Sequence, residues 1–280
     1  MPRIDLLKLN PPAKLNLFLH ILGRRADGYH RLQTAFELID WCDELELCVR
    51  EGGDIVRTGG PKDVPAELDL VVRAARALQR ASGTALGAHL HLSKYIPQGA
   101  GLGGGSSDAA ATLLGLNRLW NLRWPLERLA KLGLELGADV PVFLGQQPAW
   151  AEGVGERLLA LPFVKREYLV VFPGVALATG PMFAEPALRR DCAPLSLERY
   201  QQGSPVTNVF EAVAYARSPE IAAAAQWLAA NIGPASMTGS GSALFVRIRD
   251  RAPVQARMRA APITWTWRCV RSIANWFDKP

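Results

Sequence analysis

The chain has 280 residues, 49% of them hydrophobic and 21% charged, which is ordinary for a globular protein of one or two domains. Its formal net charge of +6 comes from scattered Arg and Lys residues with no basic run interleaved with aromatics, so we expect no nucleic-acid partner and only a mild attraction for small polyanions. No apolar run reaches the length of a membrane span, the first residues lack the order of a signal peptide and the four cysteines form no CxxC pair, so we expect a cytoplasmic protein without a membrane partner.

Hydrophobic periodicity predicts a strand-rich arrangement for the first half of the chain. Leucine and isoleucine alternate with other residues from Leu15 to Ile21, which is the period-two pattern of a strand, and Asp27-Gly28 marks a turn after it. Similar reasoning predicts strands at 34–39, 44–49 and 88–96, and a helix over 67–80.

A glycine-dense loop over 97–108 follows the last of these strands and runs into a helical pattern over 109–120. Glycines let backbone N–H groups approach a ligand closely, and a helix start adds unpaired donors with a partial positive charge. The loop therefore predicts a phosphate site. The alternative without a binding function is a flexible linker, although linkers seldom join a strand to a well-formed apolar helix.

Two familiar phosphate loops do not fit this stretch. A Walker loop is excluded because two serines stand where Lys-Ser or Lys-Thr belongs. Gly99, Gly101 and Gly104 match a dinucleotide-binding pattern, but a second helical pattern over 125–136 follows in place of the strand that this fold requires.

Beyond residue 157 the order of predicted elements changes to β-α-β-β-α-β, the split arrangement of ferredoxin-like domains. The elements are a strand at 168–172, a helical stretch over 207–230 broken at Ser218-Pro219, strands at 235–238 and 242–248, a helix at 254–260 and a strand at 263–270. We therefore expect an α+β protein of two domains, 1–157 and 158–280.

Four motifs now make the chain similar to a known superfamily. The segment around Lys14, the glycine loop, Gly137–Pro141 and Met237–Ser242 occur in the order seen in the galactokinase, homoserine kinase and mevalonate kinase (GHMP) superfamily. Within it, the stretches 12–17, 25–30 and 152–156 resemble the 4-diphosphocytidyl-2-C-methyl-D-erythritol kinase family. The resemblance covers about residues 10 to 248.

This resemblance implies a fold and a reaction. The fold would pair an N-terminal α/β domain like that of ribosomal protein S5 with a C-terminal ferredoxin-like domain, the active site lying in the cleft between them. The reaction would move the γ-phosphate of ATP onto the 2-hydroxyl of a methylerythritol that carries a cytidine diphosphate, a step toward isoprenoid precursors. The enzyme would act as a monomer or homodimer.

The resemblance gives Lys14 and Asp139 catalytic roles. Lys14 would favour the phosphoryl-transfer transition state, Asp139 would be the general base, and Asn16, on the same strand face as Lys14, would bind substrate. Lys14 and Asp139 each have a simpler structural explanation: a lysine on a strand is usually solvated, and an Asp two residues before a proline is a good helix N-cap.

The resemblance also implies a site for the cytosine base of the substrate. Tyr29 would stack on the base, His30 would hydrogen-bond its polar edge, Phe183 would close the sandwich and Thr179 would donate a hydroxyl nearby. The alternatives are an ordinary aromatic lid over the hairpin and, for Phe183, a place in the core.

The ATP phosphates are assigned to the glycine loop. The residues that the resemblance implies are Lys94, Pro97, Gly99, Gly101, Leu102, Gly103, Gly104, Gly105, Ser106 and Ser107. Ser106 and Ser107 are alternatively simple helix caps, and Lys94 a surface lysine. Mg²⁺ is expected with ATP, held mainly by phosphates and water, and no protein ligand to the metal is assigned.

Two departures from the family and two other functions remain in view. Asp69 stands where members often carry Asn, which puts an adenine contact in doubt, and no acid directly follows Asn208. The competing functions are a GHMP kinase for another small alcohol, such as homoserine or mevalonate, and a nucleotide-binding protein without catalysis. Tyr29 and His30 argue against the first alternative, and Lys14 with Asp139 against the second.

Overall fold

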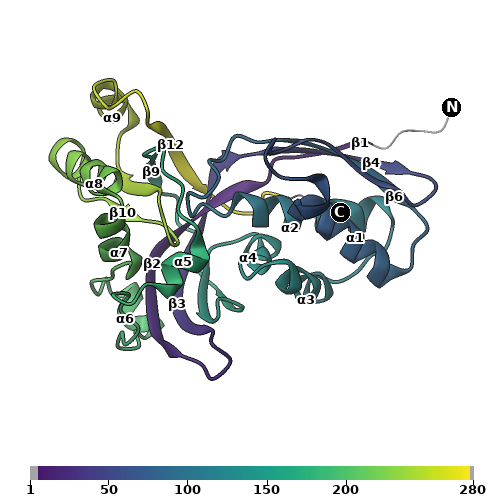
Figure 1. The fold of residues 1–280 in the computed structure, drawn as a ribbon, viewed down its shortest axis with the longest axis horizontal. Coiled ribbons are helices and arrows are strands. Elements are labelled where there is room, and N and C mark those ends of the chain that lie inside the picture. Colours follow the sequence, from purple (N-terminus) through teal and green to yellow (C-terminus); the bar gives the residue numbers. More distant parts are fainter. Residues whose placement is uncertain (1–5, 278–280) are drawn as a thin grey trace.

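Two lobes lie on either side of a long β-hairpin in the computed structural model, which describes residues 6–277 (Figure 1). The hairpin is formed by β2 (Pro12–Arg24) and β3 (His30–Cys42), which pair antiparallel. Its turn closes through the Arg25 N–H, which donates to the Tyr29 carbonyl at 2.7 Å, and the Asp27 carboxylate, which accepts from the Tyr29 N–H at 3.1 Å. The predicted strand and the Asp27-Gly28 turn are therefore confirmed.

The first lobe is a four-stranded sheet covered by helices. Its strands are ordered β1-β4-β6-β5, with β5 parallel to β6. The strands are β1 (Leu6–Leu9), β4 (Glu44–Arg50), β5 (Ile55–Gly59) and β6 (Gly87–Ser93). The helical elements are a 3₁₀ turn (Ala66–Leu68), α1 (Leu70–Ser82), α2 (Gly104–Leu119), α3 (Leu126–Leu136) and α4 (Val140–Gly145). Leucines and alanines of α1 and α2 pack on the sheet and form the first core.

The second lobe has the ferredoxin-like order that the sequence predicts. Its strands run β10-β11-β9-β12, and every neighbouring pair is antiparallel. The strands are β9 (Glu167–Phe172), β10 (Ser236–Met237), β11 (Leu244–Ile248) and β12 (Thr266–Ile273). The helices are α5 (Thr179–Ala184), α6 (Leu197–Gln201), α7 (Phe210–Arg217), α8 (Pro219–Asn231) and α9 (Arg251–Met258).

One continuous sheet joins the lobes. Strand β12 pairs with β3 through Ser272 and Ile273, and β3 continues to β7 (Ala149–Gly153) and β8 (Arg157–Ala160). After β12 the chain returns to the first lobe. There Phe277 is buried in the first core, and the Trp276 indole donates to the Phe143 carbonyl at 3.1 Å. The C-terminal tail thus follows the second lobe in sequence but packs against the first lobe and stabilises it.

The structure also differs from the periodicity in detail. Helix α2 begins at Gly104, five residues before the predicted start, because Gly103 takes the N-cap position; Ser106 and Ser107 are therefore not caps. Strands β1, β5, β7 and β8 were not predicted, and each is only four or five residues long. Among the described helices none is long and apolar enough to cross a membrane.

Candidate active site

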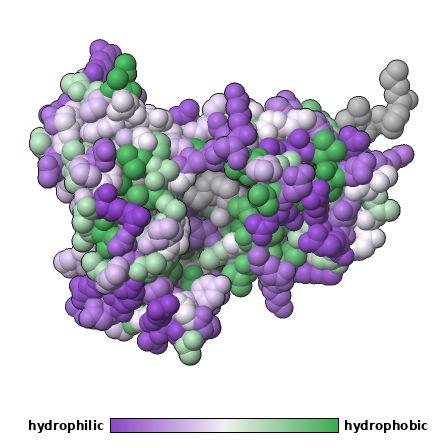
Figure 2. Space-filling view, viewed as in Figure 1, coloured by the Kyte–Doolittle hydropathy of each residue, from purple (hydrophilic) through white to green (hydrophobic). Residues whose placement is uncertain are grey.

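A cavity of about 910 Å³ lies between the lobes, and Figure 2 shows the surface hollowed there. The glycine loop and the start of α2 line one part, and the end of the hairpin and α5 line another. All the predicted site residues line it except Ser107, which is fully buried. A direct ligand contact for the Ser107 hydroxyl is therefore not supported, and its backbone N–H already donates to Gly103 within the helix.

Lys14 is buried at the floor of the cavity. Its side chain is 4% exposed, so the solvated alternative is wrong. The ammonium donates to the Asn16 side-chain oxygen at 2.5 Å and to the Gly101 carbonyl at 2.8 Å, and it lies 3.5 Å from the Asp139 carboxylate. Burial lowers the pKa of Lys14, and the Asp139 charge partly offsets this.

Asp139 occupies the N-cap position of α4, as the sequence predicts, but its side chain makes no capping hydrogen bond. The carboxylate instead faces Lys14 and the cavity, with 35% of the side chain exposed. The helix N-cap alternative therefore explains where Asp139 stands in the chain but not where its side chain points. A carboxylate that is about one-third exposed and paired with one buried cation is available to a substrate hydroxyl.

The glycine loop and the Met237–Ser242 loop are packed backbone against backbone. Gly101 has a φ of +74°, and a Cβ there would lie 2.3 Å from the Thr238 carbonyl oxygen. Gly103 has the same φ, and its Cβ would lie 3.1 Å from the Lys14 side chain. The Thr238 hydroxyl also accepts from the Asn16 N–H at 2.9 Å. Glycine is required at both positions because a side chain would push the loops away from Lys14.

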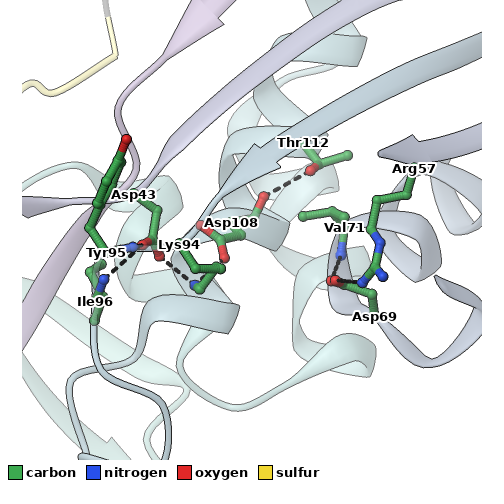
Figure 3. Close-up of polar contacts among 9 residues, drawn as sticks. All are labelled: Asp43, Arg57, Asp69, Val71, Lys94, Tyr95, Ile96, Asp108 and Thr112. Carbon is green, nitrogen blue, oxygen red and sulfur yellow. Dashed lines mark hydrogen bonds and ion pairs between the residues drawn. The ribbon is translucent and has the colours of Figure 1, made fainter. Parts of the chain in front are cut away.

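Lys94 lies between two buried carboxylates (Figure 3). It donates to Asp43 and, at 2.6 Å, to Asp108, and its side chain is 14% exposed, so the surface-lysine alternative is wrong. Asp43 also accepts the Tyr95 N–H at 2.5 Å and the Ile96 N–H at 2.8 Å, which fixes the start of the glycine loop. The sequence offered no local signal for this cluster, because its members are distant along the chain.

One cation cannot neutralise both acids. Burial would lower the pKa of Lys94, but the carboxylates of Asp108 and Asp43 outweigh it and raise that pKa above its ordinary value. Asp43 is satisfied by three donors, whereas the Asp108 Oδ1 atom is buried with no partner among the described residues. Burial, opposed by Lys94 and aided by Asp43, raises the pKa of Asp108 to about 7.

Replacing Asp108 with asparagine is expected to flatten the pH dependence of the free energy of unfolding. With its raised pKa, Asp108 keeps a proton in the native state that an unfolded aspartate, with a pKa of about 4, releases. Wild-type stability therefore falls as pH rises from about 4 to about 7, and D108N lacks this contribution. Urea denaturation at several pH values measures it. Parallel curves for the two proteins contradict the prediction.

The predicted base-binding residues come together across the lobes. The rings of His30, at the start of β3, and Phe183, in α5, stack with centroids 5.1 Å apart and an interplanar angle of 24°. Tyr29 is 65% exposed beside them. Phe183 also packs edge-on against Phe210, so it serves the core and the cavity at once. The Thr179 hydroxyl lies 3.0 Å from that of Ser240.

Three further residues hold this site and were not predicted to do so. Asn208 donates to the carbonyls of Met237 and Gly239 at 2.7 and 2.8 Å, which fixes the loop under Lys14. Arg190 contacts His30. Asp69 caps α1 by accepting from the Val71 N–H and pairs with Arg57, so its carboxylate is already engaged although it lines the cavity (Figure 3).

The chain is similar to characterised protein families over nearly its whole length. Residues 69–146 match the GHMP kinases N terminal domain, and residues 186–265 match the GHMP kinases C terminal domain. A relative from Cupriavidus necator, 4-diphosphocytidyl-2-C-methyl-D-erythritol kinase, is 46% identical and covers 98% of this chain and 96% of its own. A relative of the same name from Xanthomonas campestris pv. campestris is 50% identical, over 90% of this chain and 85% of its own.

Solved structures agree with these matches. The crystal structure of a 4-(cytidine 5'-diphospho)-2C-methyl-D-erythritol kinase superposes with a TM-score of 0.83 at 33% identity, covering 96% of this chain and 100% of the other. A homoserine kinase from Cytophaga hutchinsonii superposes with a TM-score of 0.71 at 17% identity over 98% of this chain and 96% of its own, which shows the shared fold alone. The two-domain α+β GHMP kinase fold is thereby confirmed, and the chain belongs to the 4-diphosphocytidyl-2-C-methyl-D-erythritol kinase family of GHMP kinases.

Proposed function

We propose that this protein is an ATP-dependent kinase that phosphorylates the 2-hydroxyl of 4-diphosphocytidyl-2-C-methyl-D-erythritol, on the route to isoprenoid precursors. The observation that carries the proposal is the pairing of Lys14 with Asp139 in one cavity, between a glycine-lined end and an aromatic end. The relatives' names supply the substrate. The four cysteines are free thiols, which suits a reducing cytoplasm.

The proposed chemistry is an in-line transfer. Asp139 accepts the proton of the 2-hydroxyl as its oxygen forms a bond to the γ-phosphorus, and the bond from that phosphorus to the β,γ-bridging oxygen breaks to release ADP. Lys14 lies within 3.5 Å of Asp139 and stabilises the negative charge on the transferring group. Asn16 and the Gly101 carbonyl hold the ammonium in place.

The nucleotide would be held by the glycine loop. The proposed contacts are backbone N–H groups at the start of α2, with the Ser106 hydroxyl beside them. The described residues include no group of three or more His, Cys, Asp or Glu side chains placed to hold a metal. Mg²⁺ would accompany ATP, with phosphates and water as its main ligands. When bound, the cation neutralises charge on the phosphate oxygens.

ATP consumption by the purified protein with Mg²⁺ tests this function. The comparison is 4-diphosphocytidyl-2-C-methyl-D-erythritol against homoserine and mevalonate. Turnover with the cytidyl compound alone is expected. Activity on another alcohol alone would retain the fold and reject the cytosine site, and silence with all three would indicate a protein without catalysis.

Replacing Tyr29 with alanine is expected to raise KM for the cytidyl substrate about 5- to 150-fold, because stacking on a base contributes about 1–3 kcal/mol. Tyr29 is 65% exposed, so the protein itself loses little packing. ATP affinity should not change. Tyr95→Ala is the matched control, since Tyr95 is 49% exposed and does not line the cavity. Equal weakening of both nucleotides would make Tyr29 a structural residue.

A further inference from the structure

Arg190 lies outside the cavity and touches two residues that line it. Its guanidinium donates through Nε to the His30 Nε2 atom at 3.2 Å. Two other bonds reach the carbonyls of Phe183, at 2.9 Å, and Glu185, at 2.7 Å, and a third reaches the Leu188 carbonyl at 2.9 Å. One side chain therefore ties the start of β3 in the hairpin to the end of α5 in the second lobe.

The contact with His30 constrains the position of a proton. Arginine is always protonated and has no acceptor, so the Nε2 atom that it faces must be the acceptor. In a neutral imidazole the proton then sits on Nδ1. Burial, with the charges of Arg190 and Arg24, lowers the pKa of His30, which keeps the ring neutral at physiological pH. No hydrogen bond to Nδ1 occurs within residues 6–277, so this N–H remains available.

We infer that Arg190 is a positioning residue that locks His30 as the Nδ1–H tautomer, so that the site offers a hydrogen-bond donor to the base and selects cytosine over uracil. The inference rests on the proposed function, in which His30 meets the base edge. Cytosine N3 is an acceptor and pairs with this donor. Uracil carries N3–H, so two donors would oppose one another there and both would stay unpaired.

Arg190 also orders the ring stack that forms one wall. It holds the Phe183 carbonyl, while the Phe183 ring stacks on His30 at 5.1 Å. The guanidinium thus fixes both the tautomer and the ring opposite it. Neighbouring Arg189 differs: its side chain is 66% exposed and pairs only with Asp191, at 3.2 Å, among the described residues.

The first test reads the tautomer directly and needs no substrate. Nitrogen-15 spectra of the imidazole rings distinguish protonated from unprotonated nitrogen, and the chain has only four histidines to assign. We expect Nδ1–H for His30 in the wild-type protein and a mixture of tautomers in Arg190→Met. A wild-type ring protonated at Nε2 would overturn the inference whatever the enzyme's activity.

The second test measures selectivity. The ratio of kcat/KM for the cytidyl substrate to that for its uridyl analogue is expected to fall about tenfold or more in Arg190→Met, through KM, with kcat within about threefold of wild type. Arg189→Met, which removes the same charge, should keep the wild-type ratio. An unchanged ratio in Arg190→Met overturns the inference, and so does an equal fall in both variants. A wild-type protein inactive on the cytidyl compound would reject the proposed function, and the imidazole spectrum would still decide the tautomer.

Discussion

The Asp139→Asn variant is expected to lose at least about a hundredfold in kcat while its affinities for ATP and for the cytidyl substrate stay within a few-fold of wild type. Asparagine keeps the shape of the side chain but cannot take the hydroxyl proton. The helix should not suffer, because the Asp139 carboxylate makes no capping bond that the change would remove. Single-turnover kinetics with binding measurements on both nucleotides separate the chemical step from affinity.

A second readout comes from Lys14. The Asp139 charge raises the pKa of Lys14 against the effect of burial, so the residual activity of Asp139→Asn should fall at a lower alkaline pH than the wild-type activity. Asp54→Asn, at an exposed loop position just before β5, removes the same charge and serves as the control. Near-normal turnover in Asp139→Asn would remove it from the base role.

Replacing Lys14 with methionine should lower kcat by about 10²–10³, the cost of removing one preorganised donor from a transition state. Methionine nearly fills the space of the buried lysine but carries no charge. The Asn16 oxygen and the Gly101 carbonyl lose their donor, and burial of a charge is relieved at the same time. We therefore expect only a modest change in thermal stability, which a melting curve checks.

The wild-type pH profile tests the same residue. Activity requires the charged ammonium, and burial lowers the pKa of Lys14, so kcat should fall on the alkaline side below pH 10.5. Lys131→Met, on an exposed face of α3, should leave the profile unchanged. If Lys14 and Asp139 act as a unit, the double variant should be hardly slower than the worse single one. Fully additive losses would argue against a shared step.

The local pattern of hydrophobic, glycine and turn residues predicts most of the secondary structure. The alternation in β2, the Asp27-Gly28 turn and the glycine loop depend on residues close together in sequence, because backbone preference and the side-chain period of a strand or helix are local properties. The ferredoxin-like order follows from the succession of such elements. Periodicity does not predict the short strands β5 and β8, because pairing with a neighbouring strand stabilises them more than the preferences of their own residues do.

The sequence by itself determined the family and the two-lobe fold, and every site residue that it predicted except Ser107 lines the cavity. Only the tertiary structure decided how they are used. It buried Lys14 against Asp139, engaged Lys94 with two acids and brought Arg190 to His30. These contacts join residues far apart in the chain, and a side chain's charge state and partners depend on the burial and neighbours that packing creates rather than on adjacent sequence.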